Sequence, residues 1–230
     1  MAIAAKTSTG AVNLDATKSA LTVPFVTASG DAVVVNVAVR AADVTVQSVT
    51  DSAGNTYTKK AAVFAQDVIH DNMDYTDEPM YLHATDAEVW TAIAGATAAS
   101  TLTVTLTAGA KFGVAVQSYT GATTFPQASA VVETAVSNPT VTLTGMAAGS
   151  VLSAGFTTWA GLNQAVSVGT LRNEVTSGSE DVDIEVTVAD NTVTATSSTV
   201  TLNPAQQVNY EGLTVPVALT YTVCAVEVHV

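Results

Sequence analysis

The stretch VTVQSVTDSAGNTYTKKAAV, residues 44–63, carries the pattern that decides the fold class of this chain. Its two arms are rich in valine, threonine and tyrosine, which favour the pleated, half-buried surface of a β-sheet. The segment DSAGN at residues 51–55 separates the arms. Glycine and asparagine tolerate positive φ, and Asp and Ser side chains bond back to nearby amides, so this segment predicts a turn. Residues 44–63 are therefore expected to form a β-hairpin.

The same strand pattern continues on both sides of this hairpin. Apolar residues alternate with other residues over 32–40 and again over 101–107, which is the period of a strand with a buried face. No segment has a convincing helical period. The spacing of strands and turns predicts an all-β fold, an antiparallel β-sandwich of the jelly-roll or Ig-like type. Further strands are expected at residues 20–27, 89–94, 112–119, 140–144, 151–159, 182–188, 192–202 and 213–230.

The apolar C-terminal strand belongs inside a sheet. Leu219, Tyr221 and Val223 share one parity, whereas Val226 and Val228 continue on the other. This change predicts either a bulge near Cys224 or a strand that is buried on both faces. Cys224 is the single cysteine, and its apolar neighbours predict an inert core thiol.

The expected organisation is an N-terminal arm followed by one large sandwich. Residues 1–18 are small and polar, and we interpret them as an arm or edge segment of the kind that orders against a neighbour. Residues 19–230 are expected to form a single large β-sandwich. Residues 122–138 are expected to be irregular, which leaves open a split into two sandwiches near residue 126.

The charge balance excludes several classes of partner. The net charge is -13, and the seven basic residues are too few to form a phosphate-neutralising patch. We therefore expect no binding of nucleic acid and none of an anionic membrane. Charged residues are only 12% of the chain, so threonine, serine, asparagine and glutamine must cover much of its surface.

Residues 65–88 break the alternating pattern and form the longest segment of mixed chemistry. We expect an acidic loop here, and long loops in compact domains are often functional. Carboxylates are ligands for Ca²⁺, but their spacing matches no ligand motif, so a solvated acidic loop is the alternative. We expect no cofactor, unless the loop binds Ca²⁺. The candidate metal ligands are Asp71, Asp74, Asp77 and Glu78, and the candidate interface residues are Met73, Tyr75, Met80 and Tyr81.

No other segment predicts catalysis. Asp181, Asp183 and Glu185 alternate with apolar residues and are expected on a solvated sheet face. The alternative is a weak Ca²⁺ site formed with the nearby Glu174, Glu180 and Asp190. The chain contains no GxSxG motif. We therefore assign no catalytic residue and expect the protein not to be an enzyme.

Four further segments follow one another in a recognisable order: VTDSAGNTYT at 49–58, EVWTAIAG at 88–95, STLTVTLT at 100–107 and VAVQSYTGA at 114–122. Together they resemble a β-sandwich module that recurs in phage and virus structural proteins and in microbial surface proteins. The resemblance covers roughly residues 20–125 and the C-terminal strand, and it implies the fold but assigns no catalytic residue.

These features together predict a virion structural protein, such as a capsid decoration, turret or minor capsid component. It would form a homo-oligomer, with a trimer as the expected symmetry, and would contact other capsid or surface proteins through residues 1–18 and 65–88. No secretory signal is visible in MAIAAKTSTG, and the expected location is the virion surface or the extracellular space. The alternatives are a carbohydrate-binding or adhesin-like module, and a hydrolase that uses a carboxylate such as Asp74 or Glu78.

Overall fold

The computed structural model describes residues 2–69, 81–158, 165–176, 184–203, 206–208, 214–216 and 219–230. These residues form strands joined by turns, with no helix among them, which confirms the all-β class. The strands are β1 (Ala4–Asn13), β2 (Ala20–Thr27), β3 (Ala32–Arg40), β4 (Val46–Asp51), β5 (Thr58–Ile69), β6 (Tyr81–Ile93), β7 (Ala98–Leu106), β8 (Lys111–Thr120), β9 (Ala128–Val136), β10 (Thr140–Thr144), β11 (Val151–Thr158), β12 (Val166–Val168), β13 (Thr170–Thr176), β14 (Glu185–Thr192), β15 (Ser197–Leu202), β16 (Gln206–Val208), β17 (Thr214–Pro216) and β18 (Leu219–Val228).

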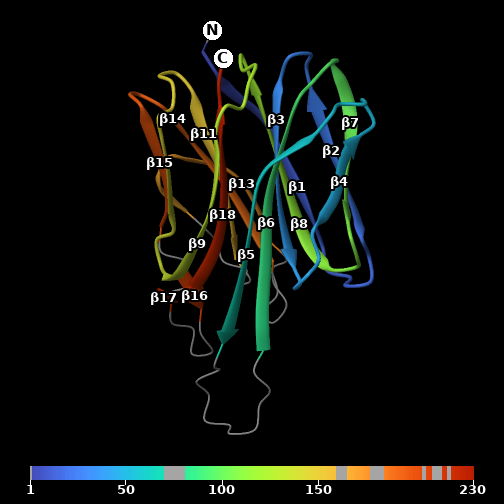
Figure 1. The fold of residues 1–230 in the computed structure, drawn as a ribbon, viewed down its shortest axis with the longest axis vertical. Coiled ribbons are helices and arrows are strands. Elements are labelled where there is room, and N and C mark those ends of the chain that lie inside the picture. The colour runs from blue at the N-terminus through green and yellow to red at the C-terminus, as the bar shows by residue number, and fades with distance from the viewer. Residues whose placement is uncertain are drawn as a thin grey trace, which may run out of the picture.

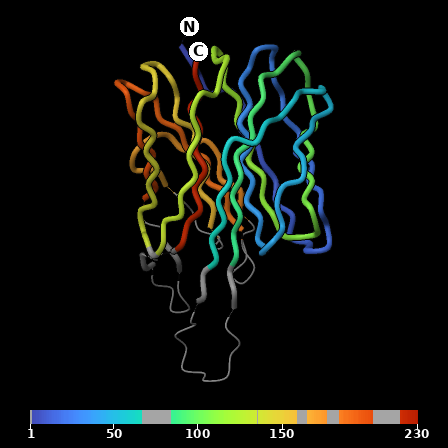
Figure 2. Tube along the Cα trace, in the orientation of Figure 1, coloured from blue at the N-terminus to red at the C-terminus, as the bar shows by residue number. Residues whose placement is uncertain are grey.

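Four antiparallel sheets build two sandwiches that stand side by side (Figure 1). In the first, the three-stranded sheet β2-β7-β4 covers the five-stranded sheet β1-β8-β3-β6-β5. In the second, the three-stranded sheet β10-β15-β12 covers the five-stranded sheet β13-β14-β11-β18-β9. Strands β16 and β17 form a separate small sheet. The tube in Figure 2 shows the first half of the chain, blue to green, beside the second half, yellow to red.

The two five-stranded sheets pack against each other, so their central strands are buried on both faces. In β3, Val33, Val35 and Val37 face the three-stranded sheet of their own sandwich. Ala32 and Val34 face the other way and pack with residues of β11 and β18. The near-continuous valine run of β3 follows from this position, because a strand between two layers needs apolar residues on both sides.

The C-terminal strand confirms the second of the two expected arrangements. Residues 220–228 are all buried, and β18 pairs with β11 and β9 without a register shift at Cys224. The only irregularity lies between Leu219 and Tyr221. The parity change therefore reflects burial on both faces rather than a bulge.

The expected hairpin over residues 44–63 is wrong, because its two arms belong to different sheets. Strand β4 pairs with β7, whereas β5 pairs with β6. The turn between them crosses the end of the first sandwich. Asp51 holds this crossing: its Oδ1 accepts from Asn55 N at 3.0 Å, and its Oδ2 accepts from Asn55 Nδ2 at 2.7 Å and Tyr57 Oη at 2.8 Å.

Two expected irregular segments are shorter than the sequence indicates. Strand β5 continues to Ile69, and β6 begins at Tyr81. Residues 65–69 and 81–88 of the expected acidic loop therefore belong to strands. Polar residues at both parities, such as Gln66 and Asp67, hide the alternation there. The segment 122–138 contains the edge strand β9, which pairs with β18. Its small residues and half-exposed face give little alternation to read.

Residues 1–18, expected as an arm, form an edge strand over most of their length. Strand β1 pairs with β8 inside the same chain. Its small residues have a steric cause, because a Cβ on Gly10 would lie 2.6 Å from Val114 O and would also overlap Val175 of β13. Asn13 ends the strand by donating its Nδ2 to Ala110 O at 2.9 Å.

We predict that Asp51→Ala destabilises the protein by about 2–3 kcal/mol, because three donors lose a charged acceptor. Burial alone would raise the pKa of Asp51, but hydrogen bonds from Asn55, Tyr57 and Ala53 lower it below 3.8. A lowered pKa stabilises the fold above the unfolded value, and that contribution is lost as the pH falls through the folded value. Urea unfolding at neutral and acidic pH measures the effect, with Thr50→Ala as the exposed control. An equal loss at both pH values would contradict the role of the ionised carboxylate.

Candidate functional site

The residues expected to bind a metal or a partner lie almost entirely outside the described part of the chain. This holds for Asp71, Asp74, Asp77 and Glu78, and for Met73, Tyr75 and Met80. Tyr81 is the first residue of β6 and pairs with Ile69. Within the described ranges, no group of three or more His, Cys, Asp or Glu side chains is arranged to hold a metal ion.

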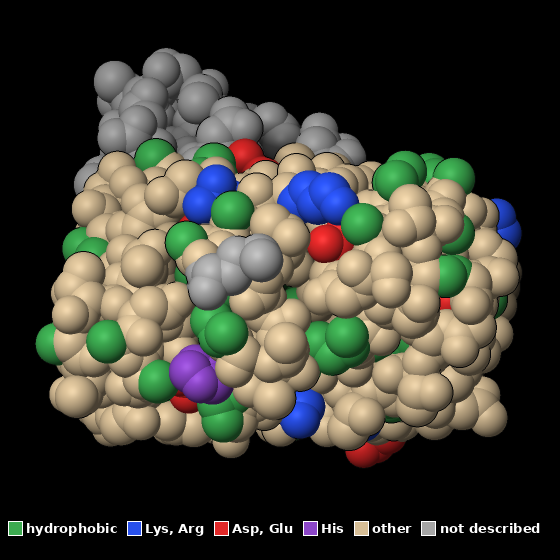
Figure 3. Space-filling model, turned by 90° about the horizontal axis from the view of Figure 1, so that it is seen from above, with side chains coloured by type: hydrophobic (Ala, Val, Ile, Leu, Met, Phe, Trp, Pro, Cys, Tyr) green, Lys and Arg blue, Asp and Glu red, His purple; other side chains and the backbone are tan. Residues whose placement is uncertain are grey.

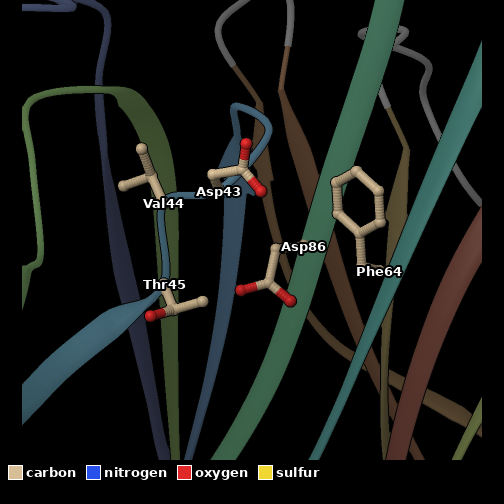
Figure 4. Close-up of a pocket in the computed structure, with 5 residues that line it drawn as sticks. All are labelled: Asp43, Val44, Thr45, Phe64 and Asp86. Carbon is tan, nitrogen blue, oxygen red and sulfur yellow. The ribbon is translucent and has the colours of Figure 1, made fainter.

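The described structure has a pocket of about 200 Å³ at the open side of the first sandwich. Asp43, Val44 and Thr45 from the β3–β4 connection form one wall, and Phe64 and Asp86 form the other (Figure 4). The side is open because β5 pairs with β6 in the five-stranded sheet and leaves β4 as the edge of the opposite sheet. The Phe64 ring is 45% exposed, so the pocket has an apolar rim.

The geometry of β6 places a second carboxylate, Glu88, beside Asp86 in the wall of this pocket. Asp86 and Glu88 lie two residues apart on β6, so their side chains leave the same face of the sheet. Phe64 of β5 pairs directly with Asp86. Trp90 continues this face into the apolar core of the first sandwich. The acidic pair therefore lies where the core meets solvent.

Glu88 is held by three donors although it is only 1% exposed. Its Oε1 accepts from Val46 N at 2.9 Å, and its Oε2 accepts from Trp90 Nε1 at 2.8 Å. Lys59 Nζ lies 2.8 Å from the same Oε2 and 5.2 Å from the centre of the Trp90 ring. These contacts tie β4, β5 and β6 together through one buried carboxylate.

Asp86 is 5% exposed, and its Oδ2 makes no hydrogen bond within the described chain. Burial and, to a smaller extent, the negative charge of Glu88 raise the pKa of Asp86 to about 7, although the charge of Lys59 opposes the rise. A hydrogen bond between the two carboxyl groups acts in the same direction as burial. Asp86 therefore binds a proton more readily than an ordinary aspartate.

This arrangement can bind a proton but does not resemble a hydrolytic site. Two carboxylates that cleave a glycosidic bond stand on opposite sides of the scissile bond. Asp86 and Glu88 instead project side by side from one strand, and the donors around Glu88 occupy both of its oxygens. The sequence carried a signal for this pair: two acids at i and i+2 lead directly into Trp90 and Ala92 on the same face of the strand.

The expected exposure of Glu185 is wrong. This residue is a buried acid in the second sandwich, as Asp86 and Glu88 are in the first. The sequence placed it on a solvated face with Asp181 and Asp183, which lie outside the described residues. Glu185 is 1% exposed, and its Oε1 accepts from Thr187 Oγ1 at 2.6 Å. The reason is that β15 covers one face of β14, and β3 and β8 of the first sandwich cover the other, so neither face is open to solvent over most of its length.

A second polar group lies near the chain ends and was not visible in the sequence. Ser150 Oγ donates to Glu227 Oε1 at 2.7 Å and lies 2.8 Å from His229 Nδ1. Because the hydroxyl of Ser150 has a single proton and donates it to Glu227, His229 Nδ1 must be the donor in its hydrogen bond with Ser150. Ser150 is fully buried, which closes it to a substrate.

Cys224 is buried, as its neighbours predicted. Burial raises the pKa of its thiol to about 12, with smaller contributions from Asp86 and Glu88. Its Sγ lies 3.3 Å from Ala87 O. The thiol is therefore a protonated packing group.

Comparisons with family models, curated proteins and solved structures find no match to this chain. The described segments include no helix with the length and hydropathy needed to cross a membrane. The site must therefore be interpreted from its own geometry.

We predict that Asp86→Asn makes the free energy of unfolding less dependent on pH. The folded pKa of about 7 exceeds the usual value of 3.8 for an aspartate, so the folded state holds this proton after the unfolded state has released it. The wild type therefore loses stability from about pH 4 to about pH 7 and then levels off. The variant lacks this loss, so its stability relative to the wild type rises over that range. Asp43→Asn, at the exposed wall of the pocket, is the control. A wild-type slope that survives in Asp86→Asn would refute the assignment.

We predict that Glu88→Gln destabilises the protein by about 3 kcal/mol, because an amide cannot accept from all three donors and leaves Lys59 without its partner. The fluorescence of Trp90 should change in the folded state, since its Nε1–H faces the new amide group. Lys59→Met removes the cation but keeps the alkyl stem, so it should cost less. A smaller loss for Glu88→Gln than for Lys59→Met would contradict the central place of the carboxylate.

Proposed function

We propose that this protein is a virion structural protein, a capsid decoration, turret or minor capsid component that acts through self-association and shell contacts. The observation that carries the proposal is the nested pairing of its strands. In the first sandwich β1 pairs with β8, β2 with β7 and β3 with β6. Three nested antiparallel pairs support the assignment of a jelly roll, a fold used in viral capsid and lectin domains, although β4 and β5 pair in different sheets.

The outer sheets support a role in packing against other proteins. The exposed face of β7 carries Thr101, Thr103 and Thr105, and that of β10 and β15 carries hydroxyl pairs. Thr142 and Thr199 are joined at 2.8 Å, and Thr140 donates to Thr201 at 3.0 Å. Figure 3 looks onto one end of the molecule, where separate patches of Lys or Arg and of Asp or Glu stand among a mostly uncharged surface. A hydroxyl-covered face can be buried against a neighbour without the cost of desolvating charges.

The carbohydrate-binding alternative shares the jelly-roll argument, but Trp90 is poorly placed to serve as its sugar platform. Trp90 gives its Nε1–H to Glu88, and Lys59 lies over its ring. An aromatic platform for a sugar needs a free ring face. The described contacts therefore favour protein packing over glycan binding.

We predict that the purified protein forms a closed homo-oligomer, with a trimer expected, in native mass spectrometry and sedimentation velocity. Copies with a net charge of -13 repel one another, so added salt should strengthen the assembly by screening that repulsion. Native mass spectra of the Glu88→Gln variant test whether assembly needs the ordered first sandwich. A protein that stays monomeric at high concentration and high salt, and that binds glycans on an array, would overturn the proposal in favour of the surface-binding module.

A further inference from the structure

The two sandwiches have the same strand order. The five-stranded sheets read β1-β8-β3-β6-β5 and β9-β18-β11-β14-β13, and the three-stranded sheets read β2-β7-β4 and β10-β15-β12. Strands β1 to β7 thus correspond in chain order to β9 to β15, and β8 corresponds to β18. The small β16–β17 hairpin is inserted before the last strand of the second sandwich.

The turn that enters the central strand is repeated in detail. Gly30 and Gly149 have φ of 84° and 85° at the same place before β3 and β11. Gly30 N donates to Ala94 O at 2.7 Å, and Gly149 N donates to Val193 O at 3.0 Å. Each following residue also accepts through its carbonyl oxygen: Asp31 from Ala94 N and Ser150 from Val193 N, both at 2.8 Å.

The pairing registers extend this equivalence through the sheets. Ala32 pairs with Ile93 and Tyr119, and Val151 pairs with Thr192 and Val228 in the same way. Equivalent side chains then face equivalent directions. Val37 and Phe156 lie in the cores of their own sandwiches, as do Val114 and Val223. The correspondence therefore includes the division between inner and outer faces.

The contacts between the two sandwiches are symmetric under this equivalence. Strand β1 lies against β13 as β9 lies against β5, and β8 lies against β14 as β18 lies against β6. Strand β3 contacts β11, its own equivalent. An interface in which element i meets j and j meets i is the signature of a two-fold axis.

We infer that the chain is a tandem fusion of two copies of one eight-stranded module, joined as a two-fold dimer. The inner face of each five-stranded sheet is then an interaction surface whose partner is a second copy of the module. This inference rests on pairing and contacts within the chain and does not depend on the proposed virion role.

Asn36 and Gly155 provide a test because they are equivalent residues that touch across the interface. Both follow the glycine turn by the same number of residues, in β3 and β11. A Cβ on Gly155 would lie 2.9 Å from Asn36 Cβ and would overlap its amide. Residues that contact their own equivalents lie at the two-fold axis, so exchanging them should reproduce the same packing from the other side.

The experiment measures the urea unfolding midpoint of full-length variants. We expect Asn36→Gly to lower it by leaving a cavity, and Gly155→Asn to lower it by a clash with Asn36. The double variant Asn36→Gly/Gly155→Asn should recover most of the loss. The matched control exchanges Gly113 and Val186, which also meet across the interface, with the added Cβ 3.0 Å from Val186 Cγ2. These two positions are not equivalent, so Gly113→Val/Val186→Gly should not recover.

Two outcomes would overturn the inference. One is an Asn36/Gly155 double variant that is no more stable than the worse single variant, including one that fails to fold. The other is equal recovery in both exchanges, which would show simple contact complementarity rather than symmetry. An experimental structure of the wild-type chain gives an independent readout, because the rotation that superposes residues 4–120 on 128–228 must be close to a half-turn. A clearly different rotation would also refute the two-fold arrangement.

Discussion

The packing of the two five-stranded sheets against each other is the constraint on which the rest of the molecule depends. Strands β3, β8, β11 and β18 are buried on both faces, so neither sandwich presents a solvated inner sheet. Apolar burial is the main favourable term in folding, and here it is shared between two sandwich cores and the layer between them. Function is therefore left to the outer sheets, the sheet edges and the connecting loops.

The layer between the sandwiches is not built for stability alone. Asn36 and Gln117 are almost fully buried, and polar atoms of both make no hydrogen bond within the described chain. Such groups cost about 1–3 kcal/mol each, and an apolar pair of similar volume would avoid that cost. The Asn36 side chain fits against Gly155, and a side chain at position 155 would overlap it. The polar residues thus favour one relative placement of the sheets over shifted ones.

The sequence predicted the strands better than it predicted their partners. The alternating valines of residues 32–40 locate β3 to the residue, because a buried sheet face repeats every second position. The hairpin at 44–63 failed because both arms are good strands, and local pattern does not say which sheet each strand joins. Asp86 and Glu88 were assigned to a loop because carboxylates in a strand look like a break, although Trp90 beside them marked the core. The expected ligands and contact residues between 71 and 80 lie outside the described chain, so they remain predictions.

The duplication explains why the two halves differ most at their polar sites. Position 86 of the first half corresponds by register to Glu185 of the second, and Glu88 corresponds to Thr187. Both halves therefore keep a buried acid at the start of the same strand, but only the first adds a second carboxylate with Lys59 beside it. In the second half a hydroxyl donor, Thr187, serves the acid instead. A fused dimer can diverge in this way without losing its interface, because the shared apolar layer is separate from these sites. The result is a nearly symmetric scaffold whose two halves differ in the groups that surround one buried acid, Asp86 in the first half and Glu185 in the second.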